Sequence, residues 1–133
     1  MSSKVKYVSP ILVPISIGEL IDKITILEIK QLNMTGIKLK NINKEVKLLK
    51  NILQDKELEI DIDLINNLKV VNKNLWEIED NIRLKENKQE FDNEFIQLAR
   101  SVYKENDRRA SLKKDINKKY NSELVEEKSY NYL

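Results

Sequence analysis

The chain has 133 residues, of which 41% are hydrophobic and 35% charged, and its 24 basic and 22 acidic side chains leave a net charge of +2. Only two glycines and two prolines interrupt it, so the composition predicts a single helical domain over residues 1–133, large enough to bury its own core. The absence of cysteine and histidine excludes disulfides, thiolate sites, imidazole-bound zinc and Ser-His or Cys-His nucleophile pairs. No metal is required to hold the fold, and any bound metal would sit on carboxylate oxygens, which favours magnesium, manganese or calcium.

Basic and acidic side chains are interspersed along the chain, which argues against nucleic acid as the partner. The longest apolar stretch, Val5 to Ile21, contains Lys6, Glu19 and both prolines. We therefore expect no membrane span and no signal peptide, and hence a cytoplasmic protein.

Residues 1–15 are expected to form an extended arm, because Pro10 and Pro14 disfavour helix in the residues before them. The arm carries apolar side chains such as Tyr7, Ile11 and Leu12. These side chains need a surface, which must be either the body of the protein or a second copy. The arm thus contributes to the expectation of a homo-oligomer.

The first helix is expected to run from Ser16 to about Asn33. Ser16 and Glu19 have the spacing of a capping box, in which the hydroxyl and the carboxylate satisfy free backbone N–H groups at the helix start. The main apolar arc of this helix consists of Ile17, Leu20, Ile21, Ile24, Leu27 and Leu32. Ile26 and Ile29 form a second apolar side, so the helix should have two neighbours.

Gly36 is suited to the left-handed cap that would end the first helix. A second helix, antiparallel to the first, follows from one apolar stripe: Leu39, Ile42, Val46, Leu49 and Leu53. The acidic stretch from Asp55 to Asp63 is expected to be a loop in which Asp61 or Asp63 caps a third helix.

The third helix has apolar residues at alternating spacings of four and three, typical of a bundle or coiled-coil seam: Leu64, Leu68, Val71, Leu75, Ile78 and Ile82. Trp76 at its flank indicates core or interface rather than a ligand platform. A fourth helix, ending near Lys119, begins after Asn87 to Glu90 or after Phe91 and Asp92. The predicted fold is all-α: an antiparallel bundle of about four helices over residues 16–120, with the arm at 1–15 and a C-terminal strap at 121–133, where Leu124, Val125, Tyr130 and Tyr132 would dock.

Three polar residues of the fourth helix, Asn106, Arg109 and Lys113, share a stripe with apolar ones. Inward cations require acidic partners or a bound anion. Candidate partners on the other helices are Glu28, Asn72 and Glu79. These six residues predict either a buried ion network that fixes helix register, or a pocket for an anionic small molecule clamped by the two cations.

Two Glu-x-x-Asp pairs, Glu19/Asp22 and Glu77/Asp80, resemble the acidic helix motifs of all-α nucleotide pyrophosphohydrolases, although the clustered Glu-Glu-x-x-Glu of those enzymes is absent. An alternative function is therefore a magnesium-dependent phosphohydrolase. Its candidate metal ligands are Glu19, Asp22, Glu28 and Glu79, with the two cations on phosphate. A bundle enzyme like chorismate mutase, which also uses inward cations, is a third interpretation.

Four segments resemble an uncharacterised family of small helical proteins from bacteria and their phages: residues 15–30 (ISIGELIDKITILEIK), 75–83 (LWEIEDNIR), 95–112 (FIQLARSVYKENDRRASL) and 122–130 (SELVEEKSY). The resemblance implies a complete single-domain protein and supplies no activity. Together with the polar stripe, it leaves a non-catalytic binding or assembly protein as the first functional hypothesis.

Overall fold

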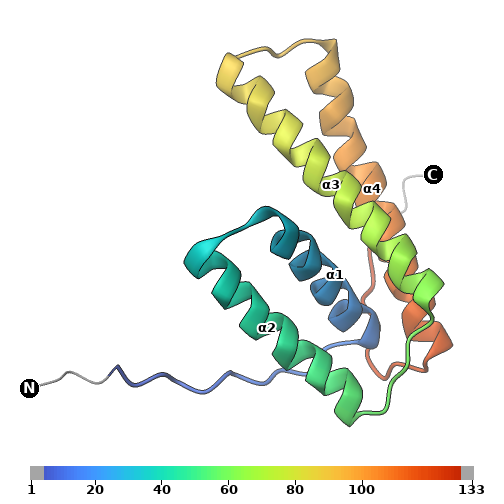
Figure 1. Cartoon of the computed structure of the whole chain (residues 1–133). Coiled ribbons are helices and arrows are strands. Elements are labelled where there is room, and N and C mark those ends of the chain that lie inside the picture. Colours follow the sequence, from blue (N-terminus) through green and yellow to red (C-terminus); the bar gives the residue numbers. More distant parts are fainter. Residues whose placement is uncertain (1–4, 130–133) are drawn as a thin grey trace, which may run out of the picture.

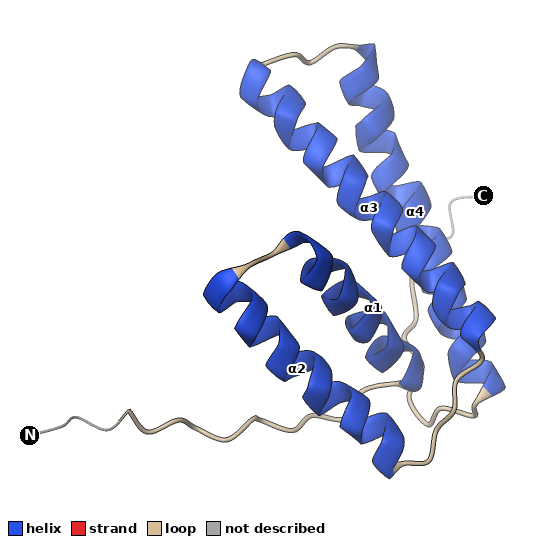
Figure 2. Cartoon of the chain, in the orientation of Figure 1, coloured by secondary structure: helices blue, strands red, loops and turns tan. Residues whose placement is uncertain are grey.

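The computed structural model describes residues 5–129 and consists of four helices packed against one another: α1 (Ile17–Asn33), α2 (Gly36–Asp55), α3 (Ile62–Lys88) and α4 (Asn93–Lys119). Two helical hairpins, α1–α2 and α3–α4, lie beside each other (Figure 1). Residues 5–129 contain no strand, as Figure 2 shows. The predicted all-α fold is confirmed.

Side-chain caps begin three of the helices. Ser16 Oγ accepts a hydrogen bond from the Glu19 amide at 3.0 Å, and the carboxylate of Asp61 accepts one from the Asp63 amide at 2.9 Å. Of the two candidate starts for α4, the structure uses Asp92, whose carboxylate accepts from the Phe95 amide at 3.0 Å. The alternative start at Asn87 is wrong, because α3 continues through it to Lys88.

Gly36 adopts the left-handed conformation, with φ of +64°, which L side chains reach only at a cost. Its place differs from the prediction, since Gly36 is the first residue of α2 and Met34 ends α1 in an extended conformation. The tight connection between the two helices therefore depends on one residue that turns the chain and starts a helix.

The core has two parts, and α1 belongs to both. Ile21, Leu68 and Ile116 form the first part, where α1, α3 and α4 meet. Leu27, Ile42 and Val46 form the second part, between α1 and α2. The expectation that α1 has two neighbours, one for each apolar side, is wrong in detail: α1 packs against α2, α3 and α4, and Ile21 and Leu27 of the main arc lie in different parts of the core. Leu32, predicted to belong to the main arc, is instead 84% exposed.

The α2 helix packs beside α1 and not beside α3 or α4. Leu53 is the residue through which α2 reaches the first core part. At the other end of the molecule, the far halves of α3 and α4 extend beyond α1 (Figure 1). The central helix α1 therefore holds the two hairpins together.

Residues 5–15 form an extended arm that leaves the start of α1 and runs past α2 (Figure 1). The arm does not bury its side chains on the body: Ile11 and Leu12 are 84% and 86% exposed. Residues 121–129 have no regular structure and lie at the start of α1, bound through Ser122 and Glu126. Tyr130 and Tyr132 of the predicted strap lie outside the described residues.

None of the helices in the described part of the chain combines the length and the apolar character needed to cross a bilayer.

Candidate functional site

Polar side chains from three helices meet where α1 crosses α3 and α4. We call this group the polar cluster; its members are Glu19, Asp22 and Thr25 of α1, Asn72 of α3, and Arg109 and Lys113 of α4. Thr25 and Asp22 are almost completely buried, and Asp22 is only 1% exposed. A charged carboxylate at that depth has to be compensated.

The carboxylate of Asp22 is compensated by two members of the cluster, Arg109 and Asn72. Arg109 Nη2 lies 3.0 Å from Asp22 Oδ2, and Asn72 Nδ2 donates to Asp22 Oδ1 at 2.8 Å. Asn72 Nδ2 also lies 2.9 Å from Thr25 Oγ1, which in turn donates to the Asp22 carbonyl. The arginine compensates through its charge, because Asp22 Oδ2 receives no aligned hydrogen bond from the described residues.

Lys113 is surrounded by carboxylates one turn further along α4. Its ammonium group forms a close ion pair with Glu19 and lies 3.7 Å from Glu126 Oε1. Burial raises the pKa of Glu19, but the hydrogen bond and the charge of Lys113 outweigh it, so that the net pKa lies below the ordinary value for glutamate. The carboxylate of Glu19 is thus held in its charged form by α4 and does not complete the predicted capping box.

The start of α1 is capped by residues about one hundred positions later in the chain. The Ile17 amide donates to Ser122 Oγ at 3.1 Å, and the Gly18 amide donates to Asn117 Oδ1 at 2.6 Å. The Ser16 hydroxyl donates to Glu126 Oε1 at 2.7 Å. The bonds from Ile17 and Gly18 satisfy backbone donors that a helix start leaves free.

Gly18 allows the close approach that these bonds require. A methyl group at this position would lie 2.5 Å from the Lys113 carbonyl oxygen and 2.9 Å from Asn117 Oδ1. Only a residue without a side chain fits between the two helices here.

Three of the six predicted ligand-binding residues, Asn72, Arg109 and Lys113, come together in the polar cluster. Glu28 does not join them; its carboxylate lies 3.3 Å from Lys50 and 3.6 Å from Lys69. Glu79 is exposed and pairs with Arg83, one turn away on the same helix. Among the contacts of residues 5–129, Asn106 contributes its backbone carbonyl alone, which accepts from Lys128 at 3.5 Å.

The expected pairing of Glu28 and Glu79 with the two cations of α4 is therefore not the one that the structure has. Of the four predicted metal ligands, Glu19 and Asp22 lie in the cluster, whereas Glu28 and Glu79 have the separate partners described above. Within residues 5–129, no three acidic side chains gather closely enough to hold a metal ion.

Two buried acids, Asp22 and Glu105, form ion pairs with arginines on α4 that were not predicted from the sequence. Asp22, considered only as a metal ligand, lies one and two turns before Ile26 and Ile29, and so belongs to the second apolar side of α1. Glu105 is 9% exposed and pairs with Arg108 at 2.8 Å, while its Oε2 has no hydrogen-bond partner among the described residues. Val102 is one of the apolar residues on the same stripe as Arg109. Glu105 lies three residues after Val102 and four before Arg109, so its position on the stripe could have been recognised from the sequence.

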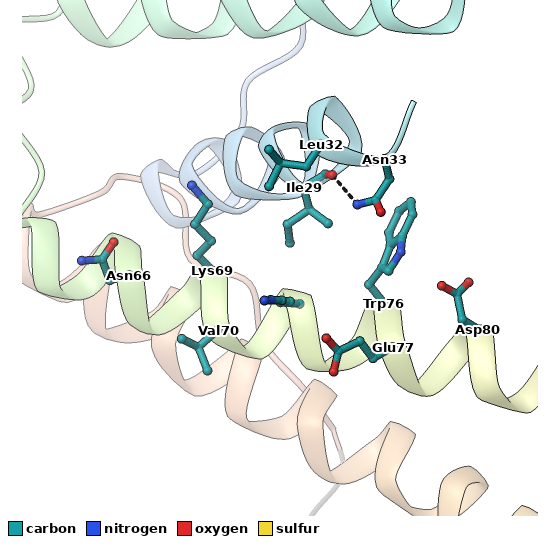
Figure 3. Close-up of a pocket in the computed structure, with 10 residues that line it drawn as sticks. Ile29, Leu32, Asn33, Asn66, Lys69, Val70, Trp76, Glu77 and Asp80 are labelled. Atoms are coloured by element: carbon teal, nitrogen blue, oxygen red, sulfur yellow. Dashed lines mark hydrogen bonds between the residues drawn. The ribbon is translucent and has the colours of Figure 1, made fainter. Parts of the chain in front are cut away.

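A groove of about 530 Å³ lies elsewhere, between the end of α1 and the middle of α3 (Figure 3). On the α1 side, Ile29, Leu32 and Asn33 line it. On α3, the lining residues recur on one face: Asn66, Lys69, Val70, Lys73, Trp76, Glu77 and Asp80. We refer to this feature as the α1–α3 groove.

Comparison with curated proteins gives no match, and comparison with solved structures gives none either. A family model does match, over residues 11–133, which include all four helices and the residues of the polar cluster. The chain therefore belongs to DUF6165, a family of unknown function.

Proposed function

We propose that this protein is a non-catalytic binding and assembly protein whose N-terminal arm attaches it to a second copy of the same chain. The observation that carries the proposal is the exposure of the arm: between Val5 and Val13, its large apolar side chains are each 66% exposed or more. Burying an apolar segment of this length against another surface lowers the free energy. A single chain leaves it uncovered.

The polar cluster supports a structural role better than a catalytic one. Each of its two cations already has carboxylate neighbours: Arg109 has Asp22, and Lys113 has Glu19 and Glu126. An anionic ligand would have to compete with these carboxylates. The binding of an anionic small molecule at Arg109 and Lys113 remains a prediction, and a thermal-shift screen with phosphates, nucleotides and carboxylates tests it.

The alternative, a magnesium-dependent phosphohydrolase, requires Glu19, Asp22, Glu28 and Glu79 around one ion. Glu28 lies between lysines of α2 and α3, and Glu79 lies on an exposed face with Arg83. Because these four acids do not surround one point, the structure supports the phosphohydrolase less well than it supports the assembly function.

The test is the oligomeric state of the full chain, measured by sedimentation velocity over a range of concentrations. We expect the wild type to form a dimer or larger oligomer, and the double variant Ile11→Asp/Leu12→Asp to be monomeric. The matched control, Ile37→Asp/Leu84→Asp, places the same charges at two other exposed apolar positions and should keep the assembly. A wild type that stays monomeric throughout, or an oligomer that the arm variant does not disturb, overturns the proposal.

A further inference from the structure

The α1–α3 groove and the arm have complementary properties. The arm is extended and apolar, and Lys6 is its single charged residue between Val5 and Ile15. Apolar side chains including Ile29, Val70 and Trp76 line the groove together with Lys69 and Lys73. Lys69 is paired with Glu28 of α1, and Glu77 and Asp80 stand at one end of the groove. We propose that the α1–α3 groove of one copy binds the N-terminal arm of a second copy; this inference deepens the proposed assembly function and rests on it.

The arm lies on the wrong side of its own chain to occupy its own groove. It runs past α2 (Figure 1). The Tyr7 ring of the arm lies 5.9 Å from Lys44 Nζ of α2. The groove is formed by α1 and α3, and α2 has no backbone neighbours on α3. Because α1 separates the arm from the groove within one chain, the arm that fits belongs to another molecule.

Charge and length together indicate a register. Lys6 is the natural partner for Glu77 and Asp80, neither of which has an ion pair with another described residue. From Lys6 to Ile11, an extended chain covers about 15 Å. From Asp80 back to Val70, α3 also covers about 15 Å. With Lys6 at the acidic end, Ile11 therefore lies against Val70, and the side chains between them pass Trp76.

The chemistry of the groove suits an extended segment. The side-chain amide of Asn66 offers both a donor and an acceptor to a backbone that has no partners of its own in the arm. Pro10 and Pro14 keep the arm extended before it binds, which reduces the conformational entropy that binding would remove. Recognition of pre-extended proline-containing segments by grooves with aromatic side chains follows the same logic.

Site-directed cross-linking tests the register, because the chain contains no natural cysteine. Two single variants of the full chain, Ile11→Cys and Val70→Cys, are mixed at a concentration at which sedimentation shows the assembly and are then oxidised. We expect the mixed disulfide between positions 11 and 70 to exceed either symmetric product several-fold. Since each chain has one thiol, every cross-link must join two molecules.

The control replaces Val70→Cys with Leu84→Cys, a position on the same helix with similar exposure, 55% against 58%. This pair should cross-link no more than random collision allows. If assembly depends on the arm but the 11–70 product does not exceed the 11–84 product, the groove is not the docking site, and the proposed function survives without this inference. If the chain does not assemble at all, both are overturned.

Charge reversal gives a second readout that does not depend on cysteine. Lys6→Glu should raise the dissociation constant of the assembly about tenfold, and Glu77→Lys/Asp80→Lys should do the same. The triple variant that combines them restores the opposite charges and should return the constant to near the wild-type value. Additive weakening in the triple variant contradicts the register.

Discussion

Arg109 shows how a charged residue on an apolar stripe can serve the fold. Its guanidinium faces Asp22, and the two groups tie the middle of α4 to the first half of α1. Asn72 adds a neutral donor from α3 to the same carboxylate. One buried acid thus has partners on two other helices, and it specifies how all three helices are rotated against one another.

Replacement of Arg109 tests this role. Arg109→Met keeps the length of the side chain but leaves Asp22 buried without a cation, so we expect the free energy of unfolding to fall by about 3 kcal/mol. Urea denaturation followed by circular dichroism measures it. Arg100→Met, on the exposed part of the same helix, is the control and should change stability little. A more stable Arg109→Met protein would instead indicate a site that is strained in the absence of its ligand.

Gly18 is a second residue whose identity the packing dictates. Gly18→Ala would place a methyl group against the Lys113 carbonyl and the Asn117 amide, so that α1 must shift away from α4. We expect a loss of about 1–3 kcal/mol, in spite of the better helix propensity of alanine. Thermal unfolding measures the loss. An unchanged or raised melting temperature would show that the two helices approach less closely than described here.

Glu19 makes the stability depend on pH. Its pKa is lower in the folded protein than in the unfolded chain, so its contribution is present above the unfolded value of about 4.3 and disappears as the pH falls through the folded value. We expect the wild type to lose more stability on acidification below about pH 5 than Glu19→Gln does. Denaturation curves at a series of pH values give the two slopes. Equal slopes would contradict the ion pair between Glu19 and Lys113.

At the scale of the helical elements, the turn between α3 and α4 is held by one lysine. Lys85 Nζ lies within about 3 Å of carboxylates of Glu90, Asp92 and Glu94. Hydrogen bonds from Asp92, Glu90 and Glu94 raise the pKa of Lys85 well above its ordinary value. Asp92 also caps α4, so this residue has two roles, as helix cap and as ion-pair partner.

Two substitutions separate these roles. Asp92→Asn keeps an oxygen that can accept from the Phe95 amide and removes the charge, whereas Asp92→Ala removes both. We expect Asp92→Ala to destabilise the protein and Asp92→Asn to destabilise it clearly less. Hydrogen exchange of the amides at the start of α4 measures the local effect. Equal losses in both variants would mean that the charge, and not the cap, matters.

The helices could be predicted from the sequence because their signals are local. Ser16 and Asp61 have the positions and the side chains that caps need, and the stripe that includes Leu68 and Leu75 has an unbroken helical period. The choice between the two starts of α4 depended on whether α3 ends before or after Asn87, which competing local patterns left open. Gly36 was correctly expected to be left-handed, but the helix to which it belongs depends on one or two residues at the boundary.

The partners of the polar residues could not be predicted to the same degree, because they depend on how helices cross. The stripe of α4 correctly indicated that Arg109 and Lys113 turn inward. It carried no information on whether they meet Glu28 or Asp22, which lie less than two turns apart on α1 and face different neighbours. The contacts of Ser122 and Glu126 with the start of α1 carry no periodic signal, so no sequence pattern pointed to them.

At the scale of the whole molecule, experiment can separate the contribution of the arm to assembly from its contribution to the fold. Because the arm contributes little to the described core, Ile11→Asp/Leu12→Asp should leave the fold intact, with an unchanged far-UV circular dichroism spectrum. In the wild type, the melting temperature should rise with protein concentration, because assembly stabilises the folded chain by mass action. The arm variant should lose this concentration dependence. A variant that unfolds outright would show that the arm belongs to the core.

The capping of α1 by later residues also has a consequence for the timing of folding. The amide of Ile17 is separated from Ser122 by 105 positions, and the hydroxyl of Ser16 from Glu126 by 110. At a synthesis rate of about 5–20 residues per second, roughly 5–20 s pass between the synthesis of the start of α1 and the synthesis of Ser122 and Glu126, which cap it. During that interval α1 can pair with α2, but not with its partners on α4. The first helix to be synthesised is thus capped last, because its contacts with Ser122 and Glu126 form only once those residues have left the ribosome.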